Sequence, residues 1–186
     1  MGSTIIELRV GDPCPTTLPM VAGLAAYEAL VPMLVGAARL ELKWPNDVLL
    51  AGTKLAGILL ERSGDHVICG VGVNLAMGPA LADRGASHLA ARRPAPDRDM
   101  FAHGLADSLA RELGRWRQDG AGESLTRWLA AAHPVGSLLS VHDDASMRVT
   151  GRFAGLEPDG GLRIALADGT IRIIRAGDVV LEESGT

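Results

Sequence analysis

The chain has 186 residues, enough for one medium domain and a small second one. Hydrophobic residues make up 47% and charged residues 22%, which is typical of a folded protein and excludes a globally disordered chain. The net charge is −4, and no basic stretch carries interleaved aromatic residues. These features argue against a nucleic-acid-binding surface, so we expect no DNA binding.

Cysteine content and hydropathy indicate the cellular compartment. The two cysteines, Cys14 and Cys69, do not form a disulfide framework, and we expect both to be reduced thiols. No apolar run approaches the roughly 18 residues that a membrane span needs, and no signal-peptide pattern is present. We therefore expect a cytoplasmic protein without membrane contact.

The first third of the chain predicts a strand, a helix and a second strand. Residues 3–9 are β-branched and apolar enough for a strand. Thr16 or Thr17 is expected to cap a helix that runs to about Leu34, with apolar residues on most of its faces, so that it is largely buried. A short strand follows at residues 40–43.

A meander of three further strands is predicted next, at residues 48–50, 54–61 and 66–75. They are separated by glycine turns, which favours antiparallel pairing. Residues 76–98 read as a long surface connection with a short helical turn near residues 87–89. Asp99 is then expected to cap an amphipathic helix to about Arg117, before a second helix at residues 123–132.

After Pro134 the pattern becomes strictly β. Short strands are predicted at residues 137–142, 148–156, 161–166 and 170–175, with turns rich in Asp and Gly between them. We expect a catalytic domain at residues 1–134 and a small β barrel at residues 135–186. A barrel of this size buries little apolar surface, so we expect it to pack against the first domain and to depend on it for stability.

Three motifs fall close together between Lys43 and Asn74. They read K-W-P-N-D-V from Lys43, K-L-A-G-I-L-L-E from Lys54, and G-V-G-V-N ending at Asn74. Their lysines, asparagines and aspartate interrupt apolar strands, and such groups are costly to bury without partners. Lysine supplies a cation for phosphate or carboxylate, and glycine lets a backbone approach a ligand closely. The motifs therefore indicate a site for an anionic, nucleotide-like ligand.

These motifs resemble the central signature of the biotin protein ligases, which activate biotin with ATP and attach it to a carrier lysine. The resemblance implies an α+β fold: a class II synthetase-like biotin/lipoate ligase catalytic domain with a mostly antiparallel sheet, followed by an SH3-like barrel. It implies biotin and ATP as substrates, Mg²⁺ as cofactor and biotinyl-5′-adenylate as intermediate. The implied partner is the biotin carboxyl carrier protein of acetyl-CoA carboxylase or a similar carboxylase.

Lys54 is the first residue to which the resemblance assigns chemistry. It implies that Lys54 contacts the biotin carboxylate and the acyl phosphate, where two anions must approach each other. Gly57 would let the strand pass close to biotin. The alternatives are a solvated strand lysine and a bulge or packing glycine.

The resemblance also implies an ATP and adenylate group. Lys43 is a second catalytic candidate. Together with Asn46 it would contact the ATP phosphates or a magnesium ion bound to them. Asp47 would hold that magnesium ion or orient a neighbouring lysine. Gly72 would make room for the base, and Asn74 would pair with the adenine edge. The structural alternatives are turn formation by Asn46 and Asp47 and a turn cap at Asn74.

The chain departs from the family at one place. The family carries a Ser-Thr-Asn segment and a G-R-G-R-x-G-R loop that closes over biotin, and residues 1–186 contain neither. We therefore expect an N-terminally truncated chain that is a poor ligase on its own, because water would reach the acyl-adenylate. The alternatives are a catalytically impaired fragment and a related lipoate or octanoate ligase or transferase, against which K-W-P-N-D-V argues. Whether the chain forms a homodimer stays open.

Overall fold

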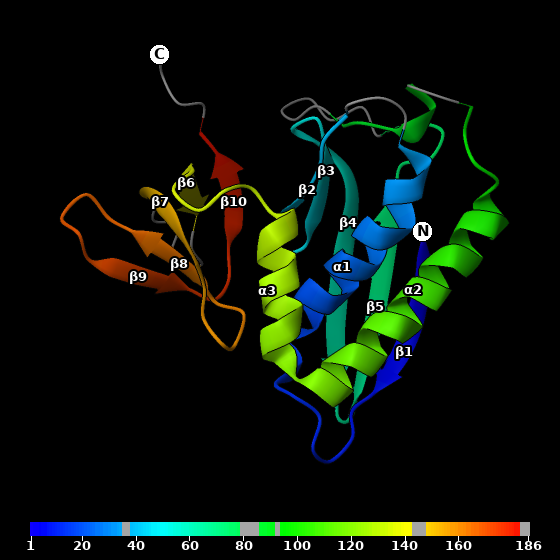
Figure 1. The fold of residues 1–186 in the computed structure, drawn as a ribbon, viewed down its shortest axis with the longest axis horizontal. Coiled ribbons are helices and arrows are strands. Elements are labelled where there is room, and N and C mark those ends of the chain that lie inside the picture. Colours follow the sequence, from blue (N-terminus) through cyan, green and yellow to red (C-terminus); the bar gives the residue numbers. More distant parts are fainter. Residues whose placement is uncertain (35–37, 79–85, 92–93, 143–147, 183–186) are drawn as a thin grey trace.

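The computed structural model describes residues 1–34, 38–78, 86–91, 94–142 and 148–182. Within these residues the chain forms two five-stranded antiparallel sheets and a layer of helices. The helices cover one face of the first sheet, and the second sheet lies beside its β2 edge (Figure 1). This arrangement confirms the predicted α+β class.

The first sheet contains the predicted meander. Its strands are β1 (Gly2–Glu7), β2 (Leu40–Lys43), β3 (Asp47–Leu50), β4 (Thr53–Ser63) and β5 (His66–Val73). They are arranged in the order β1-β5-β4-β3-β2, so β1 adds to the meander at the edge formed by β5. The turn between β3 and β4 has Ala51 and Gly52 at positive φ, as a tight hairpin requires.

Three α-helices form the second layer: α1 (Leu18–Leu30), α2 (Arg98–Asp119) and α3 (Ala121–Ala131). Short 3₁₀ turns lie at Pro15–Thr17, Val31–Met33 and Leu89–Ala91. Most of α1 is buried, as the apolar residues on most of its faces predicted. None of the helices in the described ranges is long and apolar enough to cross a membrane.

Of the two predicted helix caps, the one at Asp99 is wrong. The cap of α2 is Asp97, whose Oδ1 accepts hydrogen bonds from the backbone N–H groups of Asp99 and Met100, and Asp99 lies inside the first turn. Thr17 stands at the N-cap position of α1, as predicted, but its side chain forms no capping hydrogen bond. Its hydroxyl donates to the Cys14 carbonyl and accepts from the Trp116 indole N–H, so it fastens α1 to α2.

The second sheet has the order β10-β6-β7-β8-β9. Its strands are β6 (Leu138–His142), β7 (Arg148–Leu156), β8 (Leu162–Ala165), β9 (Ile171–Ile174) and β10 (Asp178–Leu181). We call this sheet the C-terminal barrel. Its inward side chains, including Leu139, Phe153 and Leu162, are fully buried. The proposed domain limit between residues 134 and 135 stays a prediction.

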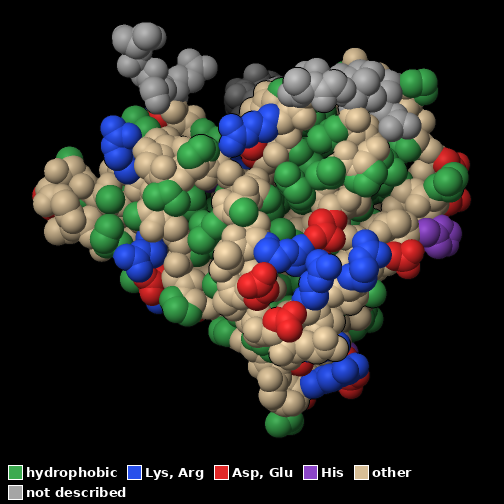
Figure 2. Space-filling model, viewed as in Figure 1, with side chains coloured by type: hydrophobic (Ala, Val, Ile, Leu, Met, Phe, Trp, Pro, Cys, Tyr) green, Lys and Arg blue, Asp and Glu red, His purple; other side chains and the backbone are tan. Residues whose placement is uncertain are grey.

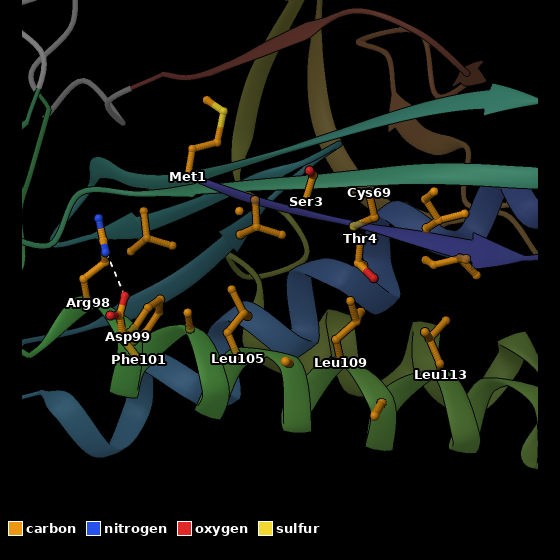
Figure 3. A pocket seen from close by; sticks show the side chains of 18 of the residues that line it. Met1, Ser3, Thr4, Cys69, Arg98, Asp99, Phe101, Leu105, Leu109 and Leu113 are labelled. Carbon is orange, nitrogen blue, oxygen red and sulfur yellow. Dashed lines mark hydrogen bonds and ion pairs between the residues drawn. The ribbon is translucent and has the colours of Figure 1, made fainter.

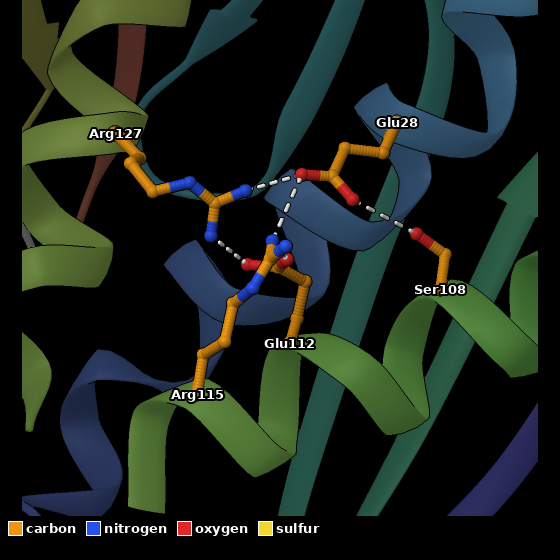
Figure 4. Close-up of polar contacts among 5 residues, drawn as sticks. All are labelled: Glu28, Ser108, Glu112, Arg115 and Arg127. Carbon is orange, nitrogen blue, oxygen red and sulfur yellow. Dashed lines mark hydrogen bonds and ion pairs between the residues drawn. The ribbon is translucent and has the colours of Figure 1, made fainter. Parts of the chain in front are cut away.

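A network of charged side chains joins the three helices (Figure 4). The Glu112 carboxylate is completely buried and lies 2.6 Å from both Arg115 and Arg127. Arg127 also pairs with Glu28 of α1, and the Ser108 hydroxyl lies 3.5 Å from the Glu28 carboxylate. On the helical face of the molecule, side chains of both signs gather over this junction (Figure 2). The network therefore holds together the layer on which the first sheet rests.

We predict that Glu112→Gln destabilises the protein by about 3 kcal/mol, because it leaves two partly buried arginines facing a neutral amide. Chemical denaturation of the variant and the parent chain measures this difference. Asp107→Asn, an exposed substitution on the same helix, is the control and should stay within about 0.5 kcal/mol of the parent. Equal effects of the two substitutions would contradict a structural role for the network.

Candidate functional site

Strand register aligns four of the predicted site residues in a single cross-strand row. Lys43 of β2 is opposite Asp47 of β3, Asp47 is opposite Gly57 of β4, and Gly57 is opposite Gly72 of β5. Directly opposed residues share one face of a sheet, so all four lie on the same side. Ile58, which follows Gly57, is buried toward the helices, so the row lies on the face that the helices leave uncovered.

Asp47 is the centre of this row. Its Oδ2 lies 3.1 Å from the Lys43 ammonium group, and its Oδ1 forms an ion pair with the Lys54 ammonium group. The Asp47 and Lys43 side chains are 8% and 10% exposed, whereas that of Lys54 is 47% exposed. Lys54 is thus the member of the group that reaches solvent, and a ligand can approach it.

Lys43 and Lys54 are the only lysines of the chain, although it contains 18 basic residues in total. All others are arginines, and both lysines contact the same carboxylate. Lysine presents a compact charge on a flexible stem, whereas arginine presents a fixed planar fork. The group therefore offers a point charge that can follow a ligand oxygen.

The glycines of the sheet strip beside Lys54 carry no side chains of their own. A Cβ on Gly57 would lie 3.0 Å from the Lys54 Cε and 3.1 Å from its Nζ, so a larger residue would push the lysine away from its path across β4. Gly70 and Gly72 of β5 share the open face. Leu59, which shares it with them, is 62% exposed. A bare backbone strip with an apolar margin and one cation suits a flat ligand that carries an anionic group.

The two predicted asparagines contact backbone groups at this site. Asn46 donates its amide N–H to the Ile58 carbonyl at 2.6 Å, and Asn74 donates to the Ser87 carbonyl at 3.0 Å. Both bonds hold segments that flank β4 in place. Their predicted contacts with phosphate and adenine stay predictions, which would have to use the other atoms of each amide.

Asp47 is a poor fit for a protein-held magnesium ion. Each of its oxygens already faces an ammonium group, so two positive charges stand where the ion would have to bind. The described residues also contain no group of three or more His, Cys, Asp and Glu side chains that could hold a metal. The geometry instead favours the other predicted role of Asp47, which is to orient a neighbouring lysine.

Lys43 and Trp44 also join the sheet to the C-terminal barrel, a role that the sequence motif did not reveal. The Lys43 ammonium group donates to the Val179 carbonyl at 2.9 Å and lies 3.5 Å from the Asp178 carboxylate, both on β10. The buried Trp44 indole donates to the Gly160 carbonyl at 2.9 Å. The nearby His133 ring is also buried, which lowers its pKa to about 4, so it stays neutral at pH 7 beside Lys43.

A cavity of about 520 Å³ lies elsewhere in the described residues. It separates β1 and β5 from α2 on the helical side of the sheet (Figure 3). Its walls are apolar, with Phe101, Leu105 and Leu109 on one side, and the Arg98 and Asp99 charges at its end pair with each other. None of the predicted site residues lines it, so the open face with Lys54 remains the candidate site.

Family models match two parts of the chain. Residues 14–74, which contain the whole cross-strand row, match the biotin/lipoate A/B protein ligase family. Residues 147–182 match the biotin protein ligase C-terminal domain. The second match covers most of the C-terminal barrel, including the β10 residues that contact Lys43.

Relatives and solved structures agree with these matches. The chain is 34% identical to a biotin–[acetyl-CoA-carboxylase] ligase of Mycobacterium tuberculosis, covering 88% of this chain but only 61% of that relative. It is 35% identical to the ligase of the same name from Paracoccus denitrificans, covering 87% and 71%. The biotin protein ligase of Aquifex aeolicus, solved in complex with biotin and ATP, superposes with a TM-score of 0.81 at 25% identity, covering 98% of this chain and 77% of that one.

The two lysines should differ sharply in what they contribute to stability. We predict that Lys43→Met costs about 3 kcal/mol, because it removes the buried one of the two partners of the Asp47 carboxylate and a bond to the barrel. Lys54→Met should cost about 1 kcal/mol, because Lys54 is half exposed and Asp47 keeps Lys43. Chemical denaturation of both variants tests this order. A reversed order would show that Lys54 serves the fold and that Lys43 does not.

Proposed function

The chain belongs to the biotin protein ligase family, and we propose from this that its open sheet face binds biotin and ATP for the synthesis of biotinyl-5′-adenylate and biotin transfer. The acceptor is a lysine of a biotin carboxyl carrier protein, as expected for a biotin–[acetyl-CoA-carboxylase] ligase. The relatives that carry this name support the proposal. The observation that carries it is the half-exposed Lys54 beside a strip of glycines, inside the segment that matches the ligase family.

The reaction consists of two displacements. In the first, a carboxylate oxygen of biotin attacks the α-phosphorus of ATP, and pyrophosphate leaves. In the second, the carrier amine attacks the acyl carbon of the mixed anhydride, AMP leaves with the electron pair, and the amine loses a proton. Neither step requires a covalent bond to the enzyme, so positioning and charge stabilisation supply the rate.

The proposed roles of the chain's own residues follow from their placement. Lys54 would reduce the repulsion between the biotin carboxylate and the α-phosphate, because its ammonium group reaches the open face. Asp47 would orient this ammonium group, and Lys43 would balance the charge of Asp47. Gly57, Gly70 and Gly72 would let the flat parts of the ligand lie against the backbone. Magnesium, when it binds, would arrive with the ATP phosphates and neutralise their charge.

Binding of a stable sulfamoyl analogue of biotinyl-5′-adenylate tests this function, because it requires no turnover. Calorimetry on the 186-residue chain should give one site per chain. Lys54→Ala should weaken the affinity by about tenfold to a hundredfold, the usual effect of losing a hydrogen bond to a charged group. Gly57→Val should weaken binding at least as much, because its side chain would displace Lys54 and occupy the open strip of sheet.

The matching lipoyl-adenylate analogue and a distant variant complete the experiment. A lipoate ligase of the same broad family would prefer the lipoyl analogue, so a preference for it would contradict the assignment to biotin. Gly122→Ala serves as the control for the glycine substitution, since no atom lies within 4 Å of its added Cβ. If the parent chain bound neither analogue, the proposed site would be wrong.

A further inference from the structure

A continuous chain of charged contacts leads from the C-terminal barrel to the open face of the first sheet, which we call the ligand face. The barrel provides the Val179 carbonyl and the Asp178 carboxylate, and both face the Lys43 ammonium group. Lys43 contacts Asp47, and Asp47 contacts Lys54. The first and last residues of this chain lie on different sheets, and the contact of Lys43 with Asp178 spans 135 positions of sequence.

The charges along this chain are balanced, with two lysines and two carboxylates in alternation. An ammonium group that has several acceptors divides its attraction among them. The closer Lys43 lies to the barrel, the less it competes with Lys54 for Asp47. Conversely, when Lys43 loses its barrel partners it should turn fully to Asp47 and loosen the Asp47–Lys54 pair.

We propose that Lys43 is a positioning residue through which the C-terminal barrel holds Lys54 in place on the ligand face. The catalytic consequence rests on the proposed function, whereas the coupling itself concerns the free protein. Two contacts of the barrel with consecutive residues support it: Trp44 donates to Gly160 while Lys43 donates to Val179. The barrel therefore binds the first two residues of the K-W-P-N-D-V motif. A shift of the barrel would move Lys43 and so change its contact with Asp47.

Lysine-selective NMR tests the coupling directly, because the chain contains only two lysines. With ¹³C,¹⁵N-labelled lysine, the Cε–Hε signals of Lys43 and Lys54 are assigned from the Lys54→Arg variant. In Asp178→Asn, the Lys54 Cε should become more mobile, because Lys43 then competes for Asp47. In Lys43→Met, the Lys54 Cε should become less mobile, because Asp47 has no other lysine.

Two matched variants separate positioning from a general effect on structure. Asp178→Glu keeps the charge and should restore the Lys54 signal toward that of the parent. Asp168→Asn changes the net charge of the barrel by the same amount in the β8–β9 turn, where Asp168 bonds to Thr170, and should leave Lys54 unchanged. The Asp178 side chain is 47% exposed, so Asp178→Asn is expected to fold even if Lys43→Met does not.

The affinity of the Asp178 variants for the biotinyl-adenylate analogue measures how the coupling affects ligand binding. Asp178→Asn should weaken it about fivefold, in the range of coupling through contact networks, and Asp178→Glu should retain it. Lys54 signals that do not respond to Asp178→Asn, or that respond equally to Asp168→Asn, would overturn the proposal. Coupling seen by NMR in a chain that binds no analogue would leave the proposal standing and overturn the proposed function instead.

Discussion

The Asp47 carboxylate is the contact on which both the site and the junction with the barrel depend. It is almost completely buried, and it faces both lysines of the chain. A buried carboxylate is tolerated only when its charge is compensated, so the two ammonium groups must stay nearby. One of them, Lys43, ties Asp47 to the barrel, and the other, Lys54, reaches the ligand face. Under the proposed function, stability and ligand binding would therefore be coupled at one side chain, with Lys43 serving the fold and Lys54 serving the ligand.

The register of the first sheet is what brings this group together. Because side chains alternate between the faces of a strand, a shift by one residue in β3 or β4 would turn Asp47 away from Gly57 and Lys54. The apolar residues between these positions, such as Val48 and Ile58, must face the helices and so fix the register. A β-bulge after Val48 then brings Lys54 opposite Leu49, two residues beyond Asp47 on the same strand. The glycines leave room on the open face for Lys54 to reach back to Asp47.

Sequence alone predicted the strands of the meander and four of the five strands of the barrel, because alternating β-branched residues and glycine turns are local signals. Strand β10 (Asp178–Leu181) was not predicted. Strand β7 was placed at its observed limits, residues 148–156. The cap of α2 was missed because Asp97 and Asp99 are two residues apart and only the local backbone geometry distinguishes them. For the site, the motif identified the row of residues but not the role of Lys43 at the junction. That role depends on a contact with Asp178, and no local pattern encodes a contact over such a separation.

A crystal structure of the chain with the biotinyl-adenylate analogue tests the central claim most directly, because the two faces of the first sheet offer the ligand different environments. We predict that the ligand lies on the open face over Gly57, Gly70 and Gly72, with the Lys54 ammonium group within hydrogen-bonding distance of its phosphate mimic. Lys43 should remain bound to Val179. A ligand found instead in the apolar cavity between β1 and α2 would contradict the account.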